Sequence, residues 1–147
     1  FPLGGKPNRV FREMKNHFMY KEESEMNDDK KLVLVVTRGC DDERSSVAWS
    51  IANGGLASGY QITMFLVSSG ADWARKGAAE NARPNPLDPP VAEMMQNVID
   101  SGGNIWVCPP CAKMRGYEQE NLIEGAELAG SVAMLGVVSE GAKTLTF

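Results

Sequence analysis

The pattern of hydrophobic and polar positions becomes regular at about residue 31. From there, short runs of β-branched and other apolar residues alternate with stretches in which apolar residues recur every three or four positions. The short runs predict strands buried in a sheet, and the longer spacing predicts amphipathic helices. The predicted strands span 32–36, 61–67, 105–107, 126–129 and 143–147; the predicted helices begin at about 41, 88, 110 and 131, with a helical turn at 119–123.

The first two predicted helices have recognisable start signals. Asp41 or Asp42 caps the first helix, and Asp88 with two prolines opens the second. Between the second strand and the second helix lies segment 68–90, which lacks clear periodicity and contains Trp73. A segment of this length indicates a function or an interface, and we expect Trp73 or its neighbours to lie between subunits. The residues expected to face the core are Val47, Ala48, Ile51 and Ala52 in the first helix and Val91, Met94, Met95, Val98 and Ile99 in the second.

Alternating strands and helices predict an α/β fold. Parallel strands joined by right-handed crossovers give a three-layer α/β/α sandwich, with the functional edge at the carboxyl ends of the strands. Three of the predicted strands, the first, the second and the third, are followed by segment 37–40, by segment 68–70 and by Cys108, respectively. We therefore expect them to share that edge.

Residues 1–30 differ from the domain predicted at 31–147. Positions 1–18 hold four basic residues against one acid, whereas 19–30 hold five acids against two bases. Helical spacing of Val10, Phe11, Met14 and Phe18 leaves open an amphipathic helix, a targeting peptide or a docking arm. We favour an N-terminal extension or tail, ordered by contacts with a neighbour.

Composition narrows the classes of function. The chain has 147 residues, 43% of them hydrophobic, which is enough for one globular domain with a substantial core. A net charge of -4 argues against a nucleic-acid binder, and no apolar run reaches the roughly 20 residues of a membrane span. Motifs of dinucleotide-binding, P-loop and nucleophile-elbow enzymes are absent. We expect no nucleic-acid partner and no membrane partner.

The cysteine content points to thiol chemistry. Three cysteines are an odd number, which fits a reducing, cytoplasmic compartment better than a secreted disulfide framework. A zinc site would need His17 together with Cys40, Cys108 and Cys111, and this set is contrived. We therefore expect no metal and no cofactor.

Segment 104–116, NIWVCPPCAKMRG, is the strongest candidate for chemistry. Its apolar run predicts a strand that ends at Cys108, and Pro110 suits the first position of a helix. Cys111 then falls in the first helical turn, with Arg115 one turn further along the same face. A helix start and a nearby guanidinium both favour a thiolate, so we expect a lowered thiol pKa at Cys108 or Cys111.

The same residues carry a resemblance to a known family. Cys108, at a strand end, is followed at +7 and +8 by Arg115 and Gly116; together with NLIEGAELAG (121–130) and the closing AKTLTF, this resembles the DsrE/DsrF-like proteins over 31–147. The resemblance implies a five-stranded, mostly parallel sheet and a homo-oligomer or hetero-oligomer, often a trimer or hexamer. In sulfur-transferring members the matching cysteine carries persulfide sulfur, which implies that role for Cys108 and sulfur donor and acceptor proteins as partners.

Three interpretations follow. The first is a sulfur carrier or sulfurtransferase-like protein, with Cys108 as persulfide carrier, Cys111 as auxiliary thiol that can resolve the persulfide as a disulfide, and Arg115 as electrostatic support. The second is a thiol-disulfide redox protein, because the CxxC spacing is shared with oxidoreductases. The third is an oligomeric binding or scaffold protein whose cysteines pack as small hydrophobic residues. Cys40 lies beside charged residues, which favours an exposed loop, although a structural role is open.

Overall fold

The computed structural model describes residues 30–147, which form a five-stranded, all-parallel sheet in the order β4-β3-β2-β1-β5. The strands are β1 Lys31–Val36, β2 Gln61–Leu66, β3 Asn104–Val107, β4 Ala126–Leu128 and β5 Lys143–Thr146. The helices are α2 Glu43–Ala57, α3 Val91–Asp100, α4 Pro109–Met114 and α5 Ser131–Ser139, with short 3₁₀ helices η1 Ser68–Ala74, η2 Ala79–Asn81 and η3 Gln119–Asn121. The predicted α/β fold is confirmed. The predictions for the N-terminal extension and for His17 lie outside the described residues.

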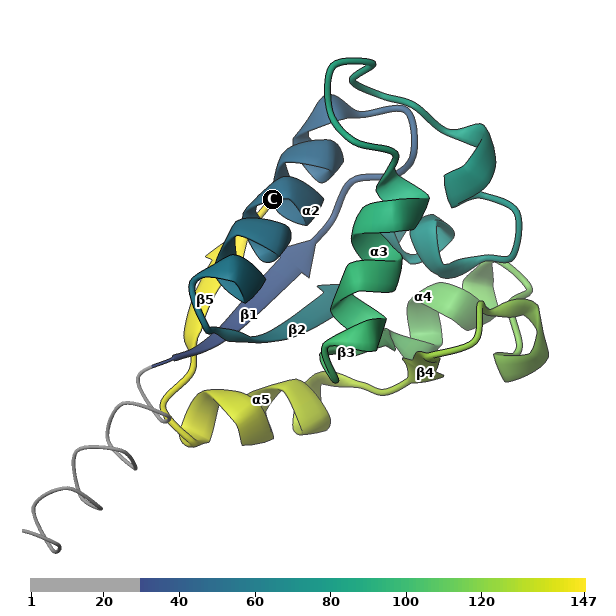
Figure 1. Cartoon of the computed structure of the whole chain (residues 1–147). Helices are drawn as coiled ribbons and strands as arrows, with labels where there is room; N and C mark the ends of the chain where they lie inside the picture. The colour runs from purple at the N-terminus through teal and green to yellow at the C-terminus, as the bar shows by residue number, and fades with distance from the viewer. Residues whose placement is uncertain (1–29) are drawn as a thin grey trace, which may run out of the picture.

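Helices cover both faces of the sheet. In Figure 1, α2 and α3 lie side by side over one face and α5 lies on the other. Leu34 and Val36 of β1 belong to the core cluster with α2 and α3, and Val33, which precedes Leu34 and so points to the opposite face, is also fully buried. β1 is thus buried on both faces, as its unbroken apolar run predicts. These layers bring the carboxyl ends of all five strands to one edge.

The buried face of α2 differs from the prediction. The helix begins after Asp42, whose carboxylate accepts a hydrogen bond from the backbone N–H of Arg44 at 2.9 Å. Val47 and Ile51 are 43% and 37% exposed, so their assignment to the core is wrong. The stripe of α2 that faces the sheet instead starts at Ser45, two residues before Val47. The helix is rotated in this way because the rotation buries the large Trp49 side chain completely. The members of the stripe are Ser45, Ala48, Trp49 and Ala52.

Segment 68–90 packs closely against the end of β1. A Cβ atom at Gly70 would lie 2.0 Å from the carbonyl oxygen of Val36, so only glycine allows this approach. Trp73 is fully buried in the core of the domain itself. The expectation that Trp73 itself lies between subunits is therefore wrong, because its indole is already covered within one chain; for its neighbours it stays a prediction.

The face covered by α5 is less protected. No residue of α5 is buried, and Val132 and Leu135 are 86% and 56% exposed. The helix has no charged residue, and Leu145 of the neighbouring edge strand β5 is also exposed. Among residues 30–147, no helix is long and apolar enough to cross a membrane.

Candidate functional site at the thiol edge of the sheet

Three loops meet where β1, β2 and β3 end. The backbone N–H of Cys108 donates to the carbonyl of Leu66 at 3.0 Å, so the cysteine segment starts beside the end of β2. On the other side of η1, a Cβ atom at Gly39 would lie 3.2 Å from the carbonyl oxygen of Ser69. The loop that carries Cys40 and the segment that carries Cys108 therefore flank the start of η1. The predicted shared edge is confirmed.

The two prolines fix the start of α4. Cys108 is the N-cap residue, and Pro109 and Pro110 take the first helical positions, where a missing N–H leaves no bond unmade. The carbonyl of Cys108 accepts a hydrogen bond from the N–H of Ala112 at 3.0 Å. Cys111 thus lies in the first turn of a short helix, as predicted, and its side chain packs against the core cluster.

A backbone amide from another loop holds the sulfur of Cys111. The N–H of Ser68 donates to Sγ of Cys111 over 3.1 Å, joining residues 43 positions apart in sequence. Ser68 has a φ of 51°, in the left-handed region that costs a non-glycine residue about 1–3 kcal/mol. The N–H group that donates to Sγ of Cys111 therefore belongs to a residue with a strained backbone conformation. Nothing in the sequence distinguishes Ser68 from an ordinary loop serine, which is why it was missed.

The environment of Cys108 differs from the expectation. Burial raises the pKa of the Cys108 thiol, the backbone N–H of Cys111 opposes this shift, and the thiol of Cys111 adds to it. The expectation of a lowered pKa at Cys108 is therefore wrong, because loss of solvent outweighs the amide donor. The effect of the Cys111 thiol on the pKa of Cys108 indicates that the two thiols lie close to each other.

Arg115 lies one turn beyond Cys111, but its guanidinium faces other groups. Its Nη1 donates to the carbonyl oxygen of Cys111 at 3.2 Å, and its Nε lies 3.6 Å from Oδ1 of Asp72. The same Oδ1 accepts a hydrogen bond of 2.6 Å from the hydroxyl of Tyr117. Burial, followed by this bond to Asp72, raises the pKa of Tyr117. Arg115 is therefore tied to η1 and to the helical turn that carries Cys111.

Cys40 has a third environment at the same edge. Burial raises its pKa to about 11, with a further contribution from the negative charge of Asp72 and an opposing one from Arg75. All three cysteines are free and partly buried. Within the part of the chain that the structure describes, no group of three or more His, Cys, Asp and Glu side chains could hold a metal ion.

Comparison with known proteins gives this site a family context. The model of the DsrE/DsrF-like family matches residues 30–147, and so includes the thiol edge, by which we mean Cys40, Ser68, Cys108, Cys111 and Arg115. The chain belongs to the DsrE/DsrF-like family. The uncharacterised protein MJ0989 of Methanocaldococcus jannaschii is 33% identical over 118 residues, which cover 80% of this chain and 99% of that protein. The uncharacterised protein MK0008 of Methanopyrus kandleri is 31% identical over 71% of this chain and 83% of its own length.

Solved structures support the fold of this DsrE/DsrF-like domain. The ychN protein from E. coli superposes with a TM-score of 0.64 at 20% identity, over 81% of this chain and 99% of its own. MTH1491 from Methanobacterium thermoautotrophicum, described as a protein of unknown function, gives a TM-score of 0.65 at 17% identity, over 81% of this chain and all of its own. At sequence identities this low, the superpositions support the fold alone.

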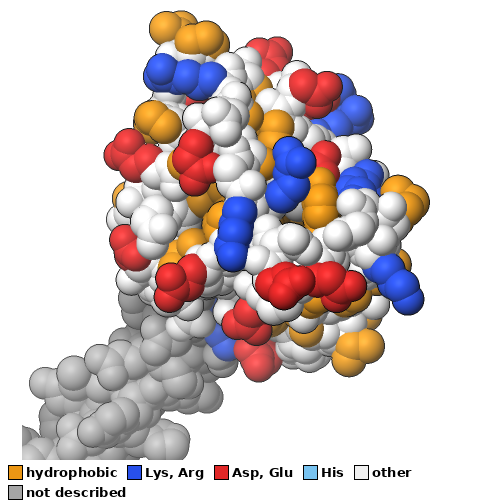
Figure 2. All heavy atoms as spheres, turned by 90° about the vertical axis from the view of Figure 1, so that its right-hand side faces the viewer, with side chains coloured by type: hydrophobic (Ala, Val, Ile, Leu, Met, Phe, Trp, Pro, Cys, Tyr) orange, Lys and Arg blue, Asp and Glu red, His pale blue; other side chains and the backbone are white. Residues whose placement is uncertain are grey.

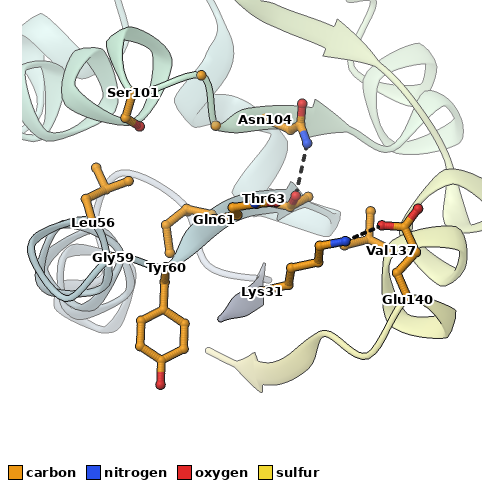
Figure 3. A pocket seen from close by; sticks show the side chains of 13 residues that line it. Lys31, Leu56, Gly59, Tyr60, Gln61, Thr63, Ser101, Asn104, Val137 and Glu140 are labelled. Carbon is orange, nitrogen blue, oxygen red and sulfur yellow. Dashed lines mark hydrogen bonds and ion pairs between the residues drawn. The ribbon is translucent and has the colours of Figure 1, made fainter. Parts of the chain in front are cut away.

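A cavity of about 490 Å³ lies at the opposite edge of the sheet, where the strands begin. Lys31 and Glu140 point toward each other there, with Nζ and Oε2 2.9 Å apart (Figure 3). Asn104 donates to the hydroxyl of Thr63 at 3.1 Å. No cysteine lines this cavity. The three cysteines of this DsrE/DsrF-like protein therefore lie away from this cavity.

Proposed function

We propose that this protein carries sulfane sulfur as a persulfide on Cys108, with Cys111 as the auxiliary thiol. The Cys108 thiolate attacks the outer sulfur of a persulfide R–S–SH. An S–S bond forms between Cys108 and that sulfur, the S–S bond of the donor breaks, and the electron pair leaves with R–S⁻. The thiol proton of Cys108 goes to solvent, and no external oxidant is needed.

The observation that carries the proposal is the pairing of unequal thiols at the family's cysteine position. Cys108 is the N-cap residue at the strand end, whereas the sulfur of Cys111 is held by the N–H of Ser68. One thiol is placed at the junction of strand and helix, and the other is held beside it.

Cys111 offers a second way to discharge the persulfide. An acceptor thiolate can attack the outer sulfur and free the Cys108 thiolate. Alternatively, the Cys111 thiolate attacks Sγ of Cys108, expels HS⁻ and leaves a disulfide between the two cysteines. The sulfane sulfur is reduced in this second step, and the two thiols are oxidised.

Mass spectrometry of protein treated with excess inorganic disulfide (HSS⁻) tests the proposal. Wild type should gain the mass of one sulfur atom at Cys108, and Cys108→Ser should abolish this gain. Cys111→Ser should keep the sulfur or hold it longer, because the resolving thiol is gone. Cys40→Ser is the matched control and should load as wild type does.

The redox and scaffold interpretations predict other outcomes. A redox protein would lose activity toward a dithiol substrate in both serine variants, without stable sulfur on either cysteine. Three unreactive thiols in the native protein would favour a scaffold. If neither wild type nor Cys111→Ser took up sulfur at Cys108, with circular dichroism unchanged, the carrier function would be wrong.

We also propose that the protein forms a homo-oligomer with α5 at the contact between copies. A trimer or hexamer is the assembly that the family resemblance implies. An exposed helix without charged residues can meet a second copy of itself without burying an unpaired charge. Leu135→Glu should weaken the assembly in light scattering, whereas Leu87→Glu, at an exposed loop leucine, should not. A wild-type monomer of 16.0 kDa at micromolar concentration would contradict this.

A further inference from the structure

A hollow lined by basic side chains lies beside the turn that carries Cys111. Its volume is about 390 Å³, and its lining includes Arg75, Lys76 and Arg115. Arg115 connects it to the thiols, because its guanidinium donates to the carbonyl of Cys111. Figure 2 shows Lys and Arg side chains near the centre of the face on the right-hand side of Figure 1, with Asp and Glu side chains around them.

Backbone hydrogen bonds between distant segments build this hollow. The N–H of Lys76 donates to the carbonyl of Asn121 at 2.9 Å, and the N–H of Ile123 donates to the carbonyl of Ala74 at 2.9 Å. The guanidinium of Arg75 lies over the Tyr117 ring, 6.0 Å from its centre. The basic side chains therefore stand on a connected framework and not on an isolated loop.

The charge balance of the hollow is positive. Arg75, Lys76 and Arg115 face one lining carboxylate, Glu120, and a second close by, Asp72. Three cations against two carboxylates differ from the whole chain, whose net charge is -4. An anionic group placed here would meet a locally favourable field in an acidic protein.

We propose that this hollow binds the carboxylates of a low-molecular-weight persulfide donor, a small peptide such as glutathione persulfide; this inference rests on the proposed function. The guanidinium of Arg115 reaches back toward the thiols, because its Nη1 lies 3.2 Å from the carbonyl oxygen of Cys111, whose thiol neighbours that of Cys108. An extended tripeptide spans about 10 Å, so the sulfur on its central residue lies about half that length from either end. A donor of this size can place a carboxylate on Arg115 with its outer sulfur toward Cys108, where the transfer written above takes place, and its other carboxylate toward Arg75 and Lys76.

Two donors that differ only in charge test the site. Glutathione persulfide and the persulfide of glutathione diethyl ester carry the same reacting sulfur, but the ester has no carboxylate. Wild type should load Cys108 about five to ten times faster from the acid than from the ester, as expected for two or three exposed charge pairs. Higher salt should reduce this preference.

The double variant Arg75→Ala/Lys76→Ala should lose the preference and keep its rate with the ester. Arg83→Ala, at an exposed arginine that does not line the hollow, is the matched control and should keep the preference. S-methylglutathione, which cannot transfer sulfur, should bind wild type more tightly than the double variant in a titration followed by NMR.

The outcomes separate the two proposals. Equal loading from acid and ester in wild type, while both load Cys108, would overturn the carboxylate site and leave the carrier function standing. Equal loss of both rates in the double variant would do the same, because the basic residues would then act on folding or on the thiol. Failure of Cys108 to load from either donor and from inorganic disulfide would overturn the carrier function and, with it, this inference.

Discussion

The loop after β1 and the segment after β3 each place a cysteine at the same edge of the sheet, yet they treat it differently. Cys40 lies where burial and Asp72 raise its pKa to about 11. Cys108 and Cys111 lie together, and the N–H of Ser68 donates to the second sulfur. Burial raises the pKa of both Cys40 and Cys108; the first loop adds a carboxylate to this effect, whereas the second segment adds a second thiol and backbone donors.

This difference shows that position at the functional edge is not sufficient for chemistry. Both cysteines follow parallel strands, and both flank the start of η1. They differ in the groups that face them: a carboxylate for Cys40, and an amide and a second thiol for the pair. The carboxyl edge supplies the location, and the neighbouring loops give each thiol its own electrostatic environment.

The largest expected effect comes from breaking the segment that lies between the two cysteine loops. Gly70→Ala places a Cβ atom 2.0 Å from the carbonyl oxygen of Val36, so η1 must move away from β1. We expect the free energy of unfolding to fall by about 3–5 kcal/mol, measured by urea denaturation. The displaced segment includes Ser68, so both cysteine environments should change together.

Gly54→Ala is the matched control for this substitution. A Cβ atom at Gly54 in α2 would have no neighbour within 4 Å, and alanine favours the helix by up to about 1 kcal/mol. The control should leave stability unchanged or raise it. An unchanged urea midpoint in Gly70→Ala would show that η1 is not held in this close approach.

A second prediction sharpens the contrast through pH. Alkylation requires the thiolate, so a pKa of about 11 moves the reactivity of Cys40 to more alkaline pH. At pH 8 we expect Cys40 to react about 100-fold more slowly than an unperturbed cysteine, with a rate that rises up to about pH 11. Peptide mapping after iodoacetamide pulses measures this rate. A plateau below pH 9 would contradict the assigned environment.

A third prediction removes the carboxylate that acts on Cys40. Asp72→Asn takes away a negative charge and leaves Arg75, so the pKa of Cys40 should fall. We expect its alkylation at pH 8 to become about three to ten times faster. Asp41→Asn is the control, because Asp41 makes a smaller contribution to the same shift. Equal acceleration in the two variants would mean that Asp72 has no special role.

Much of the fold could be predicted from the sequence because it depends on patterns within each element. Local periodicity predicts the five strands and the buried face of α3 with Met94 and Met95. The alternation of these strands with helices then predicts that the strands pair in parallel. The rotation of α2 could not be fixed in this way, because Val47 and Trp49 compete for the core and only the facing sheet decides between them. Trp73 was misplaced for the same reason.

The positions of the candidate site residues could be predicted from the sequence, but their electrostatic environments could not. Cys108, Cys111 and Arg115 lie at the predicted positions on one strand end and one helix turn. The amide of Ser68 and the carboxylate of Asp72 come from η1, far away in sequence, and no local pattern marks them. Burial of Cys108 also depends on packing between elements, so the direction of its pKa shift required the structure.

The smallest expected effect separates charge from packing at Arg115. Its guanidinium faces the carbonyl of Cys111 and the carboxylate of Asp72, and burial is the main cause of the raised pKa of Cys108. Arg115→Ala should therefore change the alkylation of Cys108 by neutral iodoacetamide by less than about twofold. Anionic iodoacetate should react about two to four times more slowly in this variant, because one cation beside the site is lost. Lys113→Ala, an exposed cation of the same helix that does not line the hollow, should slow neither reagent. Equal slowing of both reagents in Arg115→Ala would mean that the guanidinium supports the thiolate directly, whereas unchanged rates with both would remove Arg115 from the chemistry of this edge.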